Sequence, residues 1–413
     1  MKWHEIRMAA DPLSFMDSIT TRPSGLLELR ETPVPRLLVW QPEAIAWIFR
    51  SDRAMRHPGS RTLRPLLGSK SLIWLDGPRH TAYRGALGPH LRGSSLKSYV
   101  DVIARTAQQA IEPLLPGAVI RLPVWARQVT LRIISRILLD DANDELLASF
   151  TAWIEHELGS RPRTMAHRYL GNGAPRPDRH LDEMLVRSAK TARDPALAAV
   201  LLEAAGPFGR IDDAELRDQL ITLLFAGHET TASAIAWTLF WLHRDQDVLG
   251  GVLDELAATG STGEDAGDLP LLEASAYEAL RLSPPATLAG NRMPTSDTEF
   301  AGRRIPAGTV LTPAVYLAHR HPDRFSEPDR FVPDRFLGRK VPPSQYFPFG
   351  GGTRHCLGRE LALLEIRVIV TALLRQARVR FLNPRTGKPQ LRGAAMAPHH
   401  ELRIAIDARA RVL

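Results

Sequence analysis

Cys356 has the clearest capacity for chemistry, because it is the only cysteine among the 413 residues and lies in an unusual setting. The stretch Phe349-Gly-Gly-Gly-Thr-Arg-His precedes it, and the apolar pattern over about 357–378 predicts a helix after it. The N–H groups and dipole at a helix start stabilise a thiolate, and glycines let the backbone approach another group closely. A lone cysteine is more often a small apolar side chain, but such a residue needs no glycine-rich loop. The pattern therefore indicates a reactive or metal-ligating thiol.

A second group lies in the middle of a long apolar helix predicted over about 213–243, in the run Ala226-Gly227-His228-Glu229-Thr230-Thr231. Glycine in a helix interior costs about 1 kcal/mol relative to alanine, and β-branched residues add to that cost. An acid beside an alcohol can move protons. A glycine at a helix crossing and a threonine bonded to the preceding turn would explain the same residues without chemistry, and this alternative stays open for the segment alone.

Five residues of the cysteine loop complete a specific motif: Phe349, Gly352, Arg354, Cys356 and Gly358. They match the haem-binding loop of the cytochrome P450 family, Phe-x-x-Gly-x-Arg/His-x-Cys-x-Gly, so the sequence resembles that family. The resemblance implies that Cys356 is the proximal thiolate ligand of a haem iron, and such a ligand favours O–O cleavage. It also implies that Phe349 packs beside the loop, that Gly358 lets the next helix lie close to the porphyrin, and that Arg354 pairs with a propionate.

The same resemblance gives roles to the middle of the long helix. Ala226 and Gly227 would leave room for dioxygen over the iron. Thr230 would hold the bound oxygen by a hydrogen bond, and Glu229 would feed protons through water. His228 fills a variable position of the motif, so we expect it at a helix contact or in solvent rather than on the iron.

Two further groups match the family in chain order. Three basic residues, each otherwise an ordinary exposed side chain, match partners of the haem propionates: His80, Arg84 and Arg292. Three others match the buried network that braces the haem loop: Glu278, Arg281 and Arg335. On a surface, Glu278 and Arg281 would be a minor pair worth a few tenths of a kcal/mol, so the structural role implied for them depends on burial.

The resemblance implies substrate contacts by position only, at eight residues: Leu72, Leu75, Leu223, Ala286, Thr287, Leu288, Ala289 and Met396. These side chains are apolar apart from the hydroxyl of Thr287, which favours a hydrophobic substrate of terpenoid, polyketide or fatty-acyl type. The segment 159–179 is rich in glycine, proline and arginine, so we expect a surface loop there that gates entry.

The elements that must position these residues are mostly helices. Residues 24–48 predict two short strands and then a helix, the stretch 96–205 predicts several helices, and 271–282 predicts another. The chain after 378 predicts strands, and the strands do not alternate with helices, which argues against a doubly wound sheet. The resemblance implies the cytochrome P450 triangular prism fold, mainly α with small β-sheets, and a single haem domain over residues 1–413.

Composition and charge limit the partners. The net charge is +8, and the basic residues are spread without a block, which argues against a nucleic-acid tail. The sequence has no apolar stretch long enough for a membrane span and no secretory signal. We therefore expect a cytoplasmic monomer that binds no nucleic acid and no membrane. One cysteine cannot hold an iron–sulfur cluster, so an acidic ferredoxin with its reductase would supply electrons, docking on the Cys356 side near His80 and Arg354.

The expected function is that of a haem-thiolate monooxygenase in secondary metabolism, with haem b as cofactor and O2 as co-substrate, which inserts one oxygen atom into a hydrophobic molecule. Two alternatives remain. A peroxide-using enzyme of the same fold would usually lack the acid–alcohol pair of Glu229 and Thr230. A haem-free helical binding protein would leave Cys356 inert, and the spectrum of the reduced carbonyl complex separates this alternative from the expected function.

Overall fold

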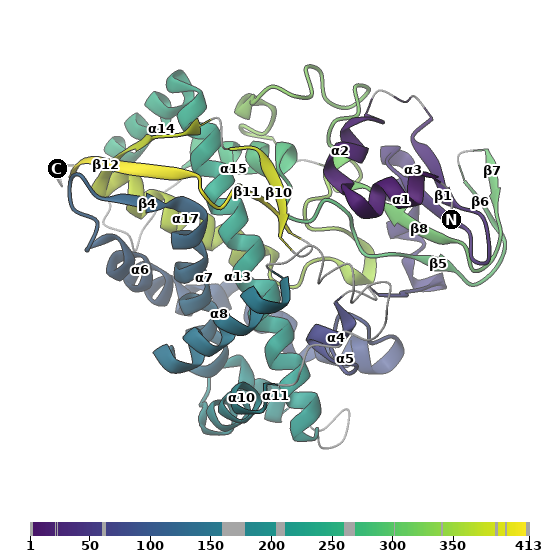
Figure 1. Cartoon of the computed structure of the whole chain (residues 1–413), viewed down its shortest axis with the longest axis horizontal. Coiled ribbons are helices and arrows are strands. Elements are labelled where there is room, and N and C mark those ends of the chain that lie inside the picture. The colour runs from purple at the N-terminus through teal and green to yellow at the C-terminus, as the bar shows by residue number, and fades with distance from the viewer. Residues whose placement is uncertain are drawn as a thin grey trace.

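The helix α13 (Asp213–Arg244) runs through the middle of the computed structural model, between a helical region and a region richer in strands (Figure 1). Asp212 caps its start, because the carboxylate accepts a hydrogen bond from the N–H of Glu215 at 2.7 Å and so satisfies a donor that the helix leaves unpaired. The predicted long helix is confirmed. Most apolar side chains of α13 are buried, so this helix forms the centre of the core.

The structure describes most of the chain, namely residues 3–20, 22, 24–59, 63–158, 178–203, 211–259, 269–300, 302–339, 342–384, 387–392 and 395–409. The segment 159–179, predicted to gate entry, lies outside the described residues except for its last two positions. Within the described ranges, no helix is both long enough and apolar enough to cross a membrane.

The helices around α13 follow the predicted pattern. The 96–205 stretch forms α6 (Lys97–Ile111), α7 (Leu122–Leu139), α8 (Asp144–Leu158), α10 (Arg179–Thr191) and α11 (Leu197–Glu203). Two further predicted helices are α15 (Pro270–Leu282) and α17 (Arg359–Gln376). The sequence pattern does not predict α14 (Gln246–Ala258), because two consecutive glycines lower its helix propensity. A Cβ on Gly251 would lie 2.8 Å from Cδ2 of Leu271, so glycine there allows α14 to pack closely on α15.

Small sheets lie at two ends of the molecule (Figure 1). The N-terminal sheet has the order β1 (Leu26–Arg30), β2 (Arg36–Val39), β8 (Val310–Pro313), antiparallel and then parallel. The C-terminal sheet has the order β4 (Val119–Arg121), β12 (Arg403–Arg409), β9 (Ala377–Phe381). The remaining strands pair as β10 (Pro389–Arg392) with β11 (Ala395–Pro398), β3 (Met55–Arg56) with β5 (Met293–Pro294), and β6 (Thr298–Phe300) with β7 (Arg303–Ile305). The predicted class, mainly α with small β-sheets, is confirmed.

Shorter helices complete the fold. These helices are α1 (Trp3–Ala10), α2 (Pro12–Asp17), α3 (Pro42–Arg50), α4 (Arg64–Leu67), α5 (Gly77–Leu87) and α16 (Val315–Ala318).

Two apolar cores lie on either side of the cysteine loop. The larger core gathers the helices around α13, and the smaller one gathers the N-terminal helices and strands. Phe347 belongs to the smaller core, whereas Phe349 and Leu357 pack against the larger one. The loop that carries Cys356 therefore lies between the two cores.

Candidate functional site

The cysteine loop, residues 347–358, folds back on itself before α17 begins at Arg359. The N–H of Cys356 donates to the carbonyl of Phe349 at 2.9 Å, which closes the loop. Gly352 has a φ of 70°, in the left-handed region that favours glycine. A Cβ at Gly352 would lie 2.7 Å from Cγ of Asp52. Glycine therefore serves here both to turn the chain and to let the Asp52 carboxylate reach the loop.

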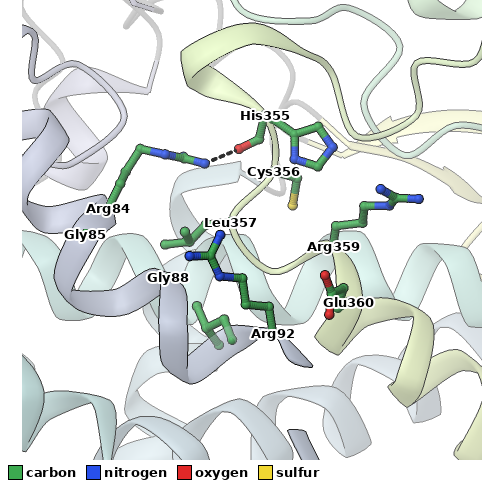
Figure 2. A pocket seen from close by; sticks show the side chains of 10 residues that line it. Arg84, Gly85, Gly88, Arg92, His355, Cys356, Leu357, Arg359 and Glu360 are labelled. Atoms are coloured by element: carbon green, nitrogen blue, oxygen red, sulfur yellow. Dashed lines mark hydrogen bonds between the residues drawn. The ribbon is translucent and has the colours of Figure 1, made fainter. Parts of the chain in front are cut away.

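The thiol of Cys356 opens onto a cavity of about 440 Å³ beside the start of α17 (Figure 2). The side chain is exposed to this cavity, but the surrounding protein still raises the pKa of the thiol through burial. The backbone N–H of Gly358 donates to the sulfur, and the charges of Arg84 and Arg359 also favour the thiolate. A metal ion bound to the sulfur would overcome the cost of burial.

Helix α5 carries two of the predicted propionate partners on one face. Nη2 of Arg84 donates to the carbonyl of His355 at 2.6 Å, so this side chain also holds the cysteine loop (Figure 2). Burial lowers the pKa of His80 to about 4, and the charges of Arg354 and Arg84 act in the same direction. His80 is therefore neutral at pH 7 and offers a hydrogen-bond donor rather than a charge.

Arg354, a third predicted propionate partner, already has several acceptors. Its Nη1 donates to the carbonyls of Leu72 and Ile73 at 3.2 and 3.3 Å. Its Nη2 donates to the carbonyl of Leu75 and to the carboxylate of Asp76. Its Nε is buried and finds no acceptor among the described residues, and a buried unpaired donor is costly. A haem propionate would satisfy that N–H, so the loop fits the predicted cofactor.

Arg292, the fourth predicted partner, is 1 % exposed and is held by Asp52, a residue that the sequence analysis missed. The Asp52 carboxylate accepts a hydrogen bond from Nε of Arg292 and another from the N–H of Thr353 at 2.7 Å. Burial alone would raise the pKa of Asp52, but the hydrogen bond from His57 and the charge of Arg292 hold it well below its usual range. Asp52 therefore ties Arg292 to the cysteine loop.

The middle of α13 has an open face although the helix runs through the core. Ala226 and Thr230 are exposed and Leu223 is half-buried, and spacings of three and four place them on one side. The Thr230 hydroxyl donates to the carbonyl of Ala226 at 2.8 Å, and its oxygen can still accept. Gly227 has a different explanation, because a Cβ there would lie 2.7 Å from Cγ1 of Ile134 on α7. A close helix crossing accounts for this glycine.

The carboxylate of Glu229 points toward two arginines rather than toward Thr230. Nε of Arg392 on β10 lies 3.2 Å from Oε2, and Nη1 of Arg127 on α7 lies 3.9 Å from Oε1. Glu229 is 2 % exposed, and its Oε1 accepts no hydrogen bond from the described residues. A bound water would donate the hydrogen bond that this buried carboxylate oxygen lacks. His228 is buried against α8, as expected for a helix contact.

The structure brings Glu278, Arg281 and Arg335 together. Nε and Nη2 of Arg281 donate to the two oxygens of the Glu278 carboxylate at 2.7 and 2.8 Å, and Nε of Arg335 donates to the same carboxylate at 3.4 Å. The other donors of Arg281 reach three carbonyls, those of His319, Pro328 and Arg330. The ring of His319 accepts the N–H of Phe347 at 2.8 Å. The network is therefore connected to the cysteine loop through His319.

The eight predicted substrate residues fall into two groups. Three pack in the larger core: Leu72, Leu75 and Leu223. Three lie in the smaller one: Leu288, Ala289 and Met396. Ala286 pairs with Ala395 beside Met396, and the buried Thr287 uses its carbonyl to accept the N–H of Tyr316 at 3.1 Å. Five of the eight are only partly buried and so remain accessible: Leu75, Leu223, Ala286, Leu288 and Ala289.

Comparison with known proteins gives consistent matches. A sequence model described as cytochrome P450 matches residues 177–404. Cytochrome P450 135A1 of Mycobacterium tuberculosis is 31% identical over 96% of this chain and 91% of its own length. The cyclooctat-9-en-7-ol 5-monooxygenase of Streptomyces melanosporofaciens is 30% identical over 91% of this chain and 87% of its own. The solved structure of retinoic-acid-bound cyanobacterial CYP120A1 has a TM-score of 0.83 at 24% identity and covers 96% of this chain and 94% of that one. This likeness confirms the predicted fold.

Proposed function

Because the chain belongs to the cytochrome P450 family, we propose that it inserts one oxygen atom of O2 into a hydrophobic small molecule, with residues 1–413 acting as one haem domain. Membership makes the chain an oxidoreductase that incorporates oxygen, binds haem b and uses O2 as co-substrate. The substrate, the electron donor and the roles of individual residues are the proposed part.

The observation that carries this proposal is the Cys356 thiol, which faces a cavity at the start of α17 and receives the N–H of Gly358. We assign it the role of thiolate ligand, with Arg84 and Arg359 stabilising the negative sulfur. Among the residues that the structure describes, no atom lies within 4 Å of a Cβ built on Gly358, so the space beside the ligand is open. When bound, the haem supplies electron transfer and O–O bond cleavage, which thiolate ligation favours.

The propionates would meet donors of two kinds. Arg84 and Arg292 supply charge as well as N–H groups, whereas the neutral His80 supplies one N–H. Arg354 contributes its unpaired Nε, the only one of its nitrogens without an acceptor among the described residues. Between these side chains, charge-assisted hydrogen bonds to the two propionate carboxylates would replace the hydrogen bonds that the propionates make with water.

Thr230 and Glu229 would have different parts in proton transfer. The hydroxyl of Thr230 donates to the carbonyl of Ala226, so its oxygen is oriented to accept a hydrogen bond on the open face of α13. Glu229 faces Arg127 and Arg392 and has one oxygen without a donor among the described residues. Protons would therefore pass between this carboxylate and Thr230 through water.

A terpenoid is the substrate class that we favour over a polyketide or a fatty-acyl chain. The relative named for cyclooctat-9-en-7-ol supports this choice. The accessible members of the predicted substrate set are leucines and alanines, which suit a hydrocarbon skeleton without charged groups. We place the reaction in secondary metabolism on the same grounds.

An acidic ferredoxin with its reductase would deliver the electrons on the Cys356 side. Arg84, Arg92 and Arg359 lie on this side of the cysteine loop, and the last two are exposed. His80 and Arg354, which the sequence places near this surface, are largely buried and cannot form it. Arg92→Glu should raise the KM for the ferredoxin and weaken its salt dependence, whereas Arg378→Glu on β9 should not. An equal effect of the two variants would exclude this docking surface.

The experiment that tests the main proposal is the spectrum of the reduced carbonyl complex. The purified protein should bind haem and show the red-shifted Soret band of thiolate ligation, and Cys356→Ser should abolish that band. His355→Gln is the matched control, because only the backbone carbonyl of His355 makes the contact with Arg84. A wild-type protein without haem, or without the shifted band, would refute the proposal.

A further inference from the structure

Gln219 is a buried polar side chain in the second turn of α13, 1 % exposed, which the reaction itself does not use. Its amide forms hydrogen bonds with the backbone of residues 68–76, which we call the 68–76 segment. The N–H of Leu72 donates to Oε1 of Gln219 at 3.0 Å, and Nε2 of Gln219 donates to the carbonyl of Lys70 at 2.6 Å. A side-chain amide that pairs with a backbone donor and acceptor two residues apart imitates a neighbouring strand.

Neighbouring side chains of α13 extend this attachment. The carboxylate of Asp218 accepts the N–H of Lys70 at 2.9 Å, and the hydroxyls of Thr222 and Ser71 lie 2.7 Å apart. Gly68 has a φ of 84°, and a Cβ there would overlap the Asp218 carboxylate at 1.9 Å. Only glycine permits the segment to start so close to the helix.

Arg354 holds the other side of the 68–76 segment. Its guanidinium donates to the carbonyls of Leu72, Ile73 and Leu75. The segment therefore has hydrogen-bond partners on α13 and on the cysteine loop, and these pair the backbone polar groups of Lys70, Leu72, Ile73 and Leu75 without a strand. In this respect it differs from a surface loop, whose backbone groups find water.

Two predicted substrate contacts, Leu72 and Leu75, lie on this segment, and both pack against the larger core. Leu223, a third predicted contact, lies one helical turn after Gln219 on the same side of α13. The hydrogen bonds of Gln219 thus fix how far Leu72 and Leu75 stand from Leu223. A shift of the segment would move two apolar side chains of the proposed substrate site together.

We propose that Gln219 is a positioning residue that sets the size selectivity of the substrate site by fixing the 68–76 segment. The inference rests on the proposed function, because it takes Leu72, Leu75 and Leu223 as substrate contacts. A purely structural role would change stability alone. A positioning role changes which ligands fit, since one methylene in an apolar pocket is worth roughly 10-fold or more in discrimination.

The test uses the holoenzyme of wild type and Gln219→Leu, a variant of similar volume that makes no hydrogen bonds. The probes are 1-alkylimidazoles from methyl to octyl and 4-phenylimidazole, whose binding on the open side of the haem shifts the Soret band. We expect the ratio of the Kd values for phenylimidazole and 1-methylimidazole to change roughly 10-fold. Amide hydrogen exchange of peptides that cover the 68–76 segment should also become roughly 10-fold faster.

Gln108→Leu is the matched control, because Gln108 is exposed on α6 and, among the described residues, its side chain bonds only that of Gln376. It should change neither readout. If Gln219→Leu does not fold, Thr222→Val takes its place as the test variant. It removes the contact with Ser71 with little change in shape, and it should shift both readouts in the same direction by a smaller factor.

Each of the other possible results would refute one part of this inference. Faster exchange with an unchanged Kd ratio would show that the segment does not shape the site, and unchanged exchange would show that Gln219 does not fix it. Haem content and the carbonyl spectrum are measured first on wild type. A missing thiolate band there refutes the proposed function, whereas a normal band with an unchanged ratio refutes only the role of Gln219.

Discussion

Replacing Glu278 with glutamine should destabilise the protein far more than the same change in an exposed pair. Glu278 and Arg281 are both fully buried, and Arg281 donates two hydrogen bonds to the carboxylate at 2.7 and 2.8 Å. Glutamine keeps the shape, but it removes the charge and turns one acceptor into a donor that faces the guanidinium. Breaking a buried ion pair by removing one partner costs about 3–5 kcal/mol. That loss is a large part of the roughly 5–15 kcal/mol by which folded proteins are stable.

The assay is urea unfolding at pH 7, followed by tryptophan fluorescence and by the Soret band. The control is Glu327→Gln, since Glu327 pairs with Arg330 at the same spacing of three residues and both side chains are exposed, 58% and 68%. We expect this control to lose no more than about 0.5 kcal/mol. A loss below about 1 kcal/mol for Glu278→Gln, or equal losses for both variants, would refute the argument from burial.

Three further predictions follow from the site. In the haem-free protein, the native state holds the pKa of His80 at about 4, below the usual 6.5, so the unfolded state binds the proton first and stability falls as the pH drops from 6.5 toward 4. Urea unfolding at pH 7 and pH 5 should therefore differ by about 2 kcal/mol less in His80→Gln than in wild type, and an equal difference would contradict the shift. Gly352→Ala should lower the free energy of unfolding by about 2–4 kcal/mol in the same assay, because the backbone there is left-handed and the methyl group would clash with Asp52. Gly350→Ala, whose Cβ would meet no atom of the described residues within 4 Å, should cost only the backbone part. Thr230→Ala should consume O2 while forming less product per O2, and unchanged coupling in an oxygen-electrode and product assay would exclude its assigned role.

The long helices were predictable from the sequence because their signals are local. The acidic cap at Asp212 and the apolar periodicity after it lie within a few residues of each other, and both hold in α13. The place of Cys356 at a helix start followed from the glycine-rich stretch and the apolar run behind it. Glu278 and Arg281 share a helix face at a spacing of three, so their pairing was also local.

The residues that escaped prediction act between segments far apart in the chain. Gln219 and Leu72 are separated by 147 residues, and Arg292 and Asp52 by 240. No periodicity or motif joins such positions, because their contact exists only after the helices pack. For Gly227 the sequence left two explanations open, room for oxygen and a helix crossing. Only the packed structure shows that a side chain there would meet Ile134, on a different helix.

Arg354 explains why the 68–76 segment and the cysteine loop act as one unit. The family motif accepts arginine or histidine at this position, yet here the side chain serves four acceptors, the carbonyls of Leu72, Ile73 and Leu75 and the carboxylate of Asp76. A histidine has at most two N–H donors, whereas arginine has five. Arginine can therefore hold the 68–76 segment and still leave Nε for a propionate. A displacement of the cysteine loop would then reach Leu72 and Leu75 through a single rigid guanidinium.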